Sequence, residues 1–381
     1  MMMWNPRTLA RIDWRIIPIL LTLMIVSLLV LSATDPAFSL SGTGAEEFFT
    51  PKVKSQAFNF LIGSAVFLFF AGFDYNKLRD WALVLYLIMC FGLLGLFFTE
   101  PIQNVHRWYR IPYVGMSIQA SEFAKLIVVI SLSWFLERRA QMASSFQTAF
   151  LGLAIVGVPF LLILKQPDLG TSLVLCPITF VMFYLGNIHP YVLRLMVIVG
   201  LCCLAFMLLI FLGVFSHTEM RPYALKFLKE YQYERLDPEN HHQQAALIAI
   251  GVGGVTGTGW RMSEFTSRGW LPYGYTDSVF PAFGEEFGLL GLLSLLVLFY
   301  ALIYFGFQVT TVAKDHFGRM LSAGVTVYIA MHVIVNIGMM CGLLPITGVP
   351  LILVSYGGSS IFVTMAALGI LQSIYSRRFM F

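Results

Sequence analysis

Ten long apolar runs, spread over nearly the whole 381-residue chain, constrain its fold more than any other feature. They cover residues 16–33, 57–73, 81–98, 118–136, 147–164, 169–186, 191–215, 287–309, 320–343 and 351–375. A helix needs roughly 20 apolar residues to cross a hydrocarbon core of about 30 Å, whereas barrel strands give alternating segments of about ten. The sequence therefore predicts an all-α integral membrane protein, a bundle of about ten transmembrane helices that forms a single polytopic domain over residues 1–381.

The composition also indicates a membrane protein. Hydrophobic residues make up 58% of the chain and charged residues only 12%, about half the charged share of soluble domains. All five cysteines lie inside apolar runs without paired spacing, which indicates neither a disulfide framework nor a metal site. We interpret the cysteines as small packing residues, and the neighbours His241 and His242 as a solvated loop pair.

The Lys and Arg residues between the runs are divided unequally between the two sides of the membrane. With the N-terminus in the cytoplasm, eleven fall inside and five fall in short loops outside. The eleven are Arg7, Arg11, Arg15, Lys77, Arg79, Arg138, Arg139, Lys314, Arg319, Arg377 and Arg378, and the five are Lys52, Lys54, Arg107, Arg110 and Lys165. This bias predicts that both termini are cytoplasmic. The net charge of +4 mostly reflects it, so no nucleic-acid partner is indicated.

A polar excursion (residues 216–276) separates the seventh and eighth runs and is predicted to be a large extracytoplasmic loop. Asp277 follows it at the membrane boundary. An acidic or basic residue at a helix centre costs roughly 2.5 to 3.5 kcal/mol, so a carboxylate beside hydrocarbon is a functional candidate by default. The glycine-rich residues 251–259 lack the Gly-Lys-Ser/Thr end of a phosphate-binding loop, and we predict a flexible or tightly turning segment there.

Glu122 and Lys125 are the most conspicuous charges inside an apolar run. They lie three residues apart on one predicted helix face, where the ammonium can contact the carboxylate. Two interpretations have about equal weight. The pair is either an internal ion pair that fixes helix packing or a charged wall of a substrate cavity.

Three further motifs contain candidate residues. Trp108 is by default an interface anchor, but Arg107-Trp108 also suits a phosphate held by the arginine and a lipid stem or sugar packed on the indole. Asp168 begins the sixth run, where capping is the leading interpretation, although helix N-termini also attract anions. Ser355 lies in residues 342–360, whose prolines and glycines predict non-helical backbone beside a cavity, with small-residue packing as the alternative.

Seven motifs, taken together and in this order, resemble the SEDS family (shape, elongation, division and sporulation). They are Arg107-Trp108, Gln119-x-Ser121-Glu122-x-x-Lys125, Gln166-Pro167-Asp168-Leu169-Gly170-Thr171, Leu271-Pro272 to Thr276-Asp277, Glu285-Glu286-x-Gly288, Asn336-Ile337-Gly338-Met339 and Val354-Ser355-Tyr356-Gly357-Gly358-Ser359. The likeness spans nearly the whole chain. Both tails are short, which favours the elongation branch of the family over the division branch.

The resemblance implies a peptidoglycan glycosyltransferase of the bacterial cytoplasmic (inner) membrane. Such an enzyme polymerises lipid II, a disaccharide-peptide carried on undecaprenyl diphosphate, with a class B penicillin-binding protein as its transpeptidase partner. The implied fold is a ten-helix bundle with a cavity open toward the outer leaflet. By the same resemblance, Asp277 is the essential aspartate, Glu122 and Lys125 are a paired charge needed for activity, and Arg107-Trp108 is a functional outer-loop motif.

These residue types suit glycan polymerisation. Asp277 can act as the general base that takes the acceptor hydroxyl proton. Arg107, Lys125 or a bound divalent cation can stabilise the departing diphosphate. The sequence departs from the family pattern at Ala120, Tyr273 and Tyr275, where proline, glutamate and histidine are usual. Two alternatives stay open, a transporter that flips lipid II and a scaffold for the transpeptidase.

Overall fold

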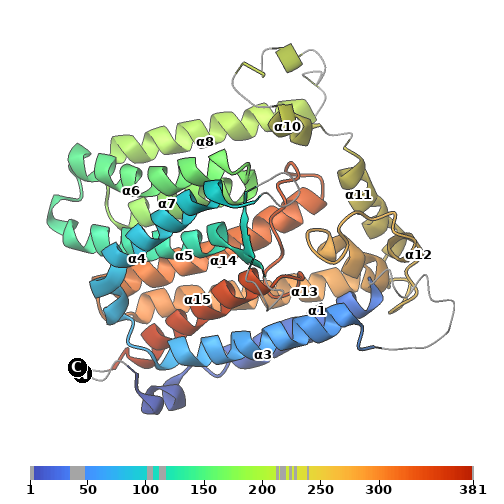
Figure 1. The fold of residues 1–381 in the computed structure, drawn as a ribbon, viewed down its shortest axis with the longest axis horizontal. Helices are drawn as coiled ribbons and strands as arrows, with labels where there is room; N and C mark the ends of the chain where they lie inside the picture. The colour runs from blue at the N-terminus through green and yellow to red at the C-terminus, as the bar shows by residue number, and fades with distance from the viewer. Residues whose placement is uncertain are drawn as a thin grey trace.

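The computed structural model describes residues 4–34, 48–100, 106–110, 117–211, 214, 220–222, 225–226, 230–237 and 240–379. Within these residues the chain is almost entirely helical, and its long helices are gathered into a bundle (Figure 1). The long helices are α1 (Ile16–Ala33), α3 (Pro51–Gly72), α4 (Asn76–Gly95), α5 (Ala120–Arg138), α6 (Phe146–Lys165), α7 (Leu169–Leu185), α8 (Pro190–Phe211), α13 (Val279–Val312), α14 (His316–Met340) and α15 (Gly358–Ser376). The predicted all-α membrane fold is confirmed.

Eight of these helices are long and apolar enough to cross a membrane. Of the other two, α7 has only 17 residues, and α5 carries Glu122 and Lys125 in its buried part. The count of ten membrane crossings and the single domain over residues 1–381 therefore stay predictions.

Short elements complete the described chain. They are the 3₁₀ helices η1 (Pro6–Arg11), η2 (Leu96–Phe98), η3 (Ala140–Met142) and η4 (Glu234–Leu236), the short helices α10 (Glu230–Tyr233), α11 (His241–Gly253) and α12 (Glu264–Ser267), and the strands β1 (Trp108–Arg110) and β2 (Ser117–Gln119). β1 and β2 pair antiparallel, with Trp108 opposite Gln119.

Several helices begin before the apolar runs that predicted them, and the largest differences are at α3 and α13. α3 begins at Pro51 rather than at residue 57, because the Thr50 hydroxyl accepts a bond from the Val53 amide and proline suits the first helical turn. α13 begins at Val279 rather than at residue 287 and runs past a kink at Gly288, where φ is 63°. Hydropathy alone misses both starts because the first turns of α3 are polar and because Glu285 and Glu286 interrupt the apolar pattern of α13.

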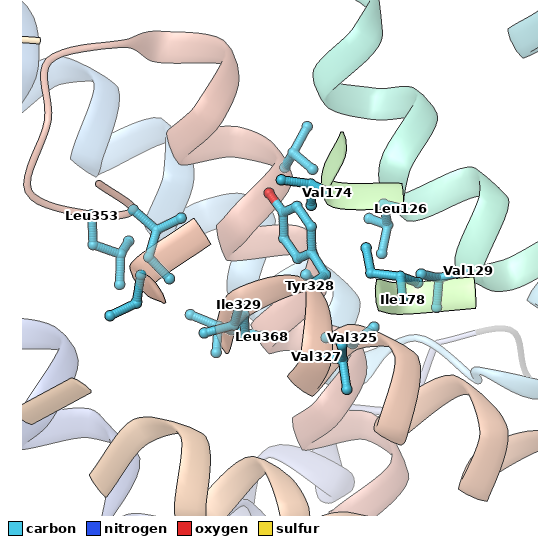
Figure 2. Close-up of a cluster of buried hydrophobic side chains, with 14 of the residues drawn as sticks. Leu126, Val129, Val174, Ile178, Val325, Val327, Tyr328, Ile329, Leu353 and Leu368 are labelled. Atoms are coloured by element: carbon cyan, nitrogen blue, oxygen red, sulfur yellow. The ribbon is translucent and has the colours of Figure 1, made fainter. Parts of the chain in front are cut away.

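α14 lies at the centre of the bundle, packed against α5, α7, α13 and α15. Figure 2 shows its Tyr328 among Leu126 of α5 and Val174 and Ile178 of α7. Gly324 permits the close approach of α14 to α5, since a Cβ atom there would lie 2.6 Å from Cγ1 of Val129. Lipid tails are as apolar as these side chains, so tight packing rather than transfer from water holds the helices together.

α8 lies at the edge of the bundle and exposes almost its whole length. Its Cys202 and Cys203 are exposed, as is Cys176 of α7. The prediction that the cysteines are packing residues is therefore wrong for these three, because a peripheral helix turns small residues toward lipid as well as toward its neighbours.

The polar excursion is partly helical and is docked on the kink of α13. The amides of Thr258 and Gly259 donate to the carbonyls of Glu285 and Glu286 over 3.0 Å each. Gly257, at φ +83°, fits directly against this backbone, because a Cβ atom would lie 2.1 Å from the Glu286 carbonyl oxygen. The glycine-rich residues thus serve tight turns and close approach.

The two ends of the bundle differ. η1 and the C-terminus lie at one end, which we call the terminal end, whereas α10, α11 and α12 lie at the other (Figure 1). Ser278, the residue after Asp277, contacts His242 of α11, and Thr347 in the non-helical residues 341–357 contacts Arg235 of η4. The turn before α13 and this non-helical segment therefore lie at the end that carries these short helices.

Candidate active site

The turn that carries Asp277 is held by backbone contacts on both sides. Within the turn, the amides of Thr276 and Ser278 donate to the Tyr273 carbonyl over 3.0 and 3.1 Å. From outside it, the side-chain amide of Asn336 on α14 donates to the Asp277 carbonyl over 2.9 Å. The same amide group donates to Val349 in the non-helical segment over 2.7 Å. Asn336 is fully buried and so fixes the Asp277 turn to the bundle core.

Ser355 also holds the turn that carries Asp277. Its hydroxyl donates to the Thr276 carbonyl over 2.6 Å and accepts from the Leu351 amide over 2.9 Å. The buried side chain of Gln56 on α3 donates to the Ser355 carbonyl over 3.1 Å. Ser355 is 4% exposed, and its hydroxyl is engaged within the protein. In this geometry it positions Asp277, and its predicted place in a substrate cavity stays a prediction.

Burial and nearby charges act in opposite directions on Asp277. The half-buried carboxyl group has a pKa raised to about 6, chiefly by burial and also by the charge of Asp168. The positive charges of Arg235 and Arg107 lower it. Gly348 lies against the carboxylate, since a Cβ atom there would be 3.4 Å from Oδ2. Two cations and a second carboxylate thus share the electrostatic surroundings of Asp277.

Backbone carbonyl groups fix both arginines. Arg107 donates from Nε to Gln166 over 3.1 Å and from Nη2 to Pro167. Arg235 donates from Nη1 to the Thr347 carbonyl over 2.9 Å. The sequence does not single out Arg235, because a single arginine in a polar loop resembles any solvated charge.

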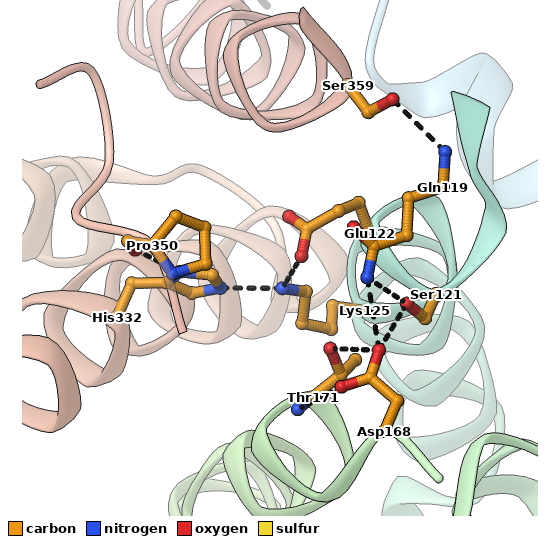
Figure 3. Close-up of polar contacts among 9 residues, drawn as sticks. All are labelled: Gln119, Ser121, Glu122, Lys125, Asp168, Thr171, His332, Pro350 and Ser359. Carbon is orange, nitrogen blue, oxygen red and sulfur yellow. Dashed lines mark hydrogen bonds and ion pairs between the residues drawn. The ribbon is translucent and has the colours of Figure 1, made fainter. Parts of the chain in front are cut away.

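Asp168 caps α7, as the sequence indicates, and also joins that helix to α5. Its Oδ1 atom accepts from the Thr171 amide over 3.2 Å. Its Oδ2 atom accepts from the hydroxyl of Ser121 over 2.8 Å and from the side-chain amide of Gln119 over 3.1 Å (Figure 3). One carboxylate therefore fixes the relative position of two helices beside the candidate site.

Glu122 and Lys125 form a buried ion pair with a third member. Lys125 Nζ lies 2.6 Å from Glu122 Oε1 and 2.7 Å from Nε2 of His332 (Figure 3). The other ring nitrogen of His332 lies 3.3 Å from the Pro350 carbonyl oxygen, which can only accept. This assigns the proton to Nδ1 and leaves Nε2 to accept from the ammonium. The side chains of Glu122 and Lys125 are 3% and 1% exposed.

The buried pair is linked to Asp277 through α14. His332 and Asn336 lie four residues apart, on one face of that helix. The first contacts Lys125 and Pro350, and the second contacts Val349 and the Asp277 carbonyl. This geometry agrees with an internal ion pair, whereas direct contact of Glu122 or Lys125 with substrate stays a prediction.

Trp108 lies in a strand that is tied to two long helices. Its partner in the register is Gln119, whose backbone amide donates to the Ser359 hydroxyl at the start of α15 over 3.1 Å. The Ser359 hydroxyl in turn donates to the Ser117 carbonyl over 3.1 Å. The half-buried Trp108 is thus held beside Arg107, and its contact with a lipid stem or sugar stays a prediction.

His242 contradicts the solvated pair predicted for the two histidines. Its Nε2 atom lies 2.6 Å from the hydroxyl of Ser278, the residue after Asp277. Burial lowers its pKa, and so does the neighbouring charge of His241. His242 lies four and seven residues before the buried Ala246 and Ala249, and so on the same face of α11. This spacing is a sequence signal that could have indicated that His242 faces the protein.

In the part of the chain that the structure describes, no three His, Cys, Asp or Glu side chains are grouped so that they could hold a metal ion. The predicted divalent cation therefore stays a prediction.

Comparisons with known proteins identify the family of the chain. The FtsW, RodA and SpoVE family model, described as cell cycle protein, matches residues 13–378. The chain is 33% identical over 311 residues to the peptidoglycan glycosyltransferase MrdB of Escherichia coli (strain K12), covering 79% of each protein. It is 32% identical over 371 residues to stage V sporulation protein E of Bacillus subtilis (strain 168), covering 94% of this chain and 98% of that protein. It is 30% identical over 332 residues to the probable peptidoglycan glycosyltransferase FtsW of Geobacter metallireducens, covering 85% of each.

Two solved structures share the fold. One belongs to work on the coordination of polymerization and crosslinking by a peptidoglycan synthase complex, with a TM-score of 0.75, 24% identity and coverage of 97% of this chain and 99% of that one. The other is the rod shape determining protein RodA of Thermus thermophilus, with a TM-score of 0.69, 22% identity and coverage of 97% and 98%.

Proposed function

This chain belongs to the FtsW/RodA/SpoVE family of cell cycle proteins and is a peptidoglycan glycosyltransferase, and from that premise we propose that Asp277 is the general base of glycan polymerisation from lipid II. The observation that carries the proposal is the half-buried Asp277 carboxyl group, whose pKa of about 6 is influenced by two arginines. Its turn is fixed by the buried side chains of Asn336 and Ser355.

In the proposed reaction, a sugar hydroxyl of the acceptor attacks the anomeric carbon of the donor. The bond from that carbon to the lipid diphosphate breaks, and Asp277 takes the hydroxyl proton. A carboxyl group with a pKa of about 6 is mostly ionised at neutral pH and is a stronger base than a solvated aspartate. Direct displacement needs no enzyme nucleophile and inverts the anomeric centre.

Arg107 and Arg235 are the proposed contacts of the departing diphosphate. Both act electrostatically on Asp277, and both are held by backbone carbonyls. Negative charge that builds up on a leaving group is stabilised best by cations already fixed in place. The ammonium of Lys125 instead contacts Glu122 and His332, so we assign it to the support of the site.

The test is polymerisation by the purified chain together with a class B penicillin-binding protein, the proposed partner. Asp277→Asn keeps the shape of the side chain but removes the base, so we expect the rate of glycan synthesis from lipid II to fall by about 10² to 10⁴. Strand yield on a gel measures it. Glu264→Gln is the matched control, because this surface carboxylate of α12 is 80% exposed. Wild-type yield from a folded Asp277→Asn protein would exclude the proposed base.

We propose that the polymerase acts in cell elongation, on the basis of its likeness to MrdB. Loss of an elongation polymerase should turn rod-shaped cells round, whereas loss of a division polymerase should give filaments. Filaments on depletion of this chain would overturn the assignment.

A further inference from the structure

The terminal end of the bundle, where η1 and the C-terminus lie (Figure 1), contains a cavity of about 540 Å³. Its walls come from the end of η1, the residues just before α1, the last turn of α15 and the residues that follow it. Sites that bind small molecules commonly have volumes of roughly 300–1,000 Å³. The proposed polymerisation chemistry uses none of the residues that line it.

The cavity carries a net positive charge. Arg11, Arg15 and Arg378 line it together with a single carboxylate, that of Asp13, which gives three positive charges against one negative. Arg15 is committed to Asp13 by two bonds, from Nε to Oδ1 over 2.8 Å and from Nη2 to Oδ2 over 2.7 Å. Arg11 and Arg378 therefore supply the excess of two.

Arg11 and Arg378 are available to an anion. Among the described residues, no carboxylate lies within ion-pair distance of either guanidinium. Arg378 donates one hydrogen bond to the Tyr375 carbonyl over 2.9 Å, and its guanidinium carbon lies 3.6 Å from the centre of the Tyr375 ring. A guanidinium has five N–H donors in a fork that matches phosphate oxygens, so most donors of Arg378 are left for a ligand.

Exposed aromatic side chains place this cavity at the depth of lipid headgroups. Trp14 and Phe379 line it and are 63% and 72% exposed. Amphipathic and aromatic rings of this kind gather at the boundary between membrane and water. Leu21 and Ile25 of α1 follow Trp14 at spacings of seven and eleven residues and are 54% and 56% exposed. They form an apolar stripe that leads from the cavity toward the membrane interior.

We propose that this cavity binds the phosphate group of an anionic phospholipid, with Arg11 and Arg378 as donors and the acyl chains along the α1 stripe. Basic pockets between helices at a membrane surface bind acidic headgroups. A zwitterionic headgroup would bring an ammonium group toward the same arginines. The site therefore selects glycerophospholipids that carry net negative charge.

The test measures lipid binding to the full chain in neutral detergent by native mass spectrometry, with phosphatidylglycerol and phosphatidylcholine as probes. Wild-type protein should bind the first more tightly. Arg11→Gln with Arg378→Gln should weaken phosphatidylglycerol binding by roughly fivefold per arginine, the effect of about 1 kcal/mol each, and leave phosphatidylcholine binding unchanged.

The matched control is Arg79→Gln with Arg138→Gln. These residues line a second cavity of about 570 Å³, whose two arginines are offset by two carboxylates, Asp80 and Glu137. The control therefore removes the same number of positive charges, but from a cavity without net positive charge in the wild type. An equal loss of phosphatidylglycerol binding in this control would show that only the overall surface charge matters, and would overturn the proposed site. Equal binding of the two lipids, or unchanged binding in the first double variant, would also overturn it.

A third arm separates a lipid from free phosphate. Inorganic phosphate should compete poorly, because it lacks acyl chains for the α1 stripe, and Leu21→Ser should weaken phosphatidylglycerol but not phosphate. Complete displacement by phosphate at the concentration of the lipid would overturn the lipid assignment. Thermal unfolding of each variant, measured in the same detergent, identifies any loss that comes from misfolding.

Discussion

Arg235 and Arg107 set how far burial can raise the pKa of Asp277. Burial favours the neutral carboxyl group, whereas each nearby positive charge favours the ionised one. A base must be ionised to accept a proton, so activity should fall as the pH drops through about 6. The acidic limb of the pH profile of kcat/KM for lipid II polymerisation is the measure of this balance.

Arg235→Gln tests the contribution of one arginine. Glutamine can still donate to the Thr347 carbonyl, but the positive charge is lost. The pKa of Asp277 should then rise, and the acidic limb should move up by on the order of 1 pH unit. The control is Arg268→Gln, which removes an exposed charge paired with Glu264 on α12. A limb that moves equally in both variants, or in neither, would contradict the assigned role.

Gly348 is predicted to tolerate no side chain. Its φ of +76° disfavours any residue with a Cβ atom, and this backbone strain is the cause of the expected loss, because the Cβ atom itself would be in ordinary contact with Oδ2 of Asp277 at 3.4 Å. Gly348→Ala should cost about 1–2 kcal/mol of stability and reduce polymer yield. Gly200→Ala in α8, where nothing lies within 4 Å of the new Cβ atom, should leave both unchanged. Thermal unfolding in detergent compares the two, and equal melting temperatures would contradict the strain.

At the scale of elements, α14 joins the buried charges of α5 to the turn before α13. His332 contacts Lys125, and Asn336, one turn later, contacts the carbonyl of Asp277. Removal of one partner from a buried pair leaves an uncompensated charge and costs about 3–5 kcal/mol. The importance of the pair therefore needs no contact with substrate, because a shift of α14 displaces the catalytic turn.

Exchange of the two charges separates pairing from position. Glu122→Ala and Lys125→Ala should each cripple polymerisation. The swap of Glu122→Lys with Lys125→Glu should restore it only partly, because the new carboxylate faces the unprotonated Nε2 atom of His332. Adding His332→Gln, whose amide can donate, should restore more. Polymer yield and thermal unfolding are the measurements, and no recovery in either combination would contradict the linkage.

A surface pair provides the control for that series. Arg79 and Glu137 lie 3.4 Å apart with side chains 40% and 21% exposed. Surface ion pairs contribute about 0–1 kcal/mol, so Glu137→Ala should leave polymer yield near that of the wild type.

The elements that sequence predicts best are those decided by local hydropathy. Each apolar run became a helix, and the prolines and glycines of residues 342–360 correctly indicated the non-helical segment before α15. The start of α13 was missed because Glu285 and Glu286 interrupt its apolar pattern, and the helix α11 was missed because it begins with four polar residues. The partners of both lie on distant segments. The same reason hid His242, Arg235 and His332, whose roles depend on contacts with Ser278, Thr347 and Lys125.

For the whole molecule, the two ends of the bundle allow the predicted membrane orientation to be tested. The turn that contains Gln141 lies between α5 and α6, at the terminal end, whereas Glu264 of α12 lies at the opposite end (Figure 1). Both residues are exposed. If the terminal end is cytoplasmic, as the excess of eleven Lys and Arg over five predicts, these positions face opposite sides of the membrane.

Single cysteines at these positions, in a chain whose five native cysteines are replaced by serine or alanine, allow labelling with a maleimide that cannot cross membranes. Glu264→Cys should be labelled in intact spheroplasts, and Gln141→Cys only after permeabilisation, because the membrane then no longer shields the cytoplasmic face. Retained polymer yield shows that each variant is folded. The reverse pattern would place the termini outside and remove Asp277 from the face where an extracytoplasmic polymerase must work, whereas labelling of both in intact spheroplasts would contradict the assignment of opposite faces.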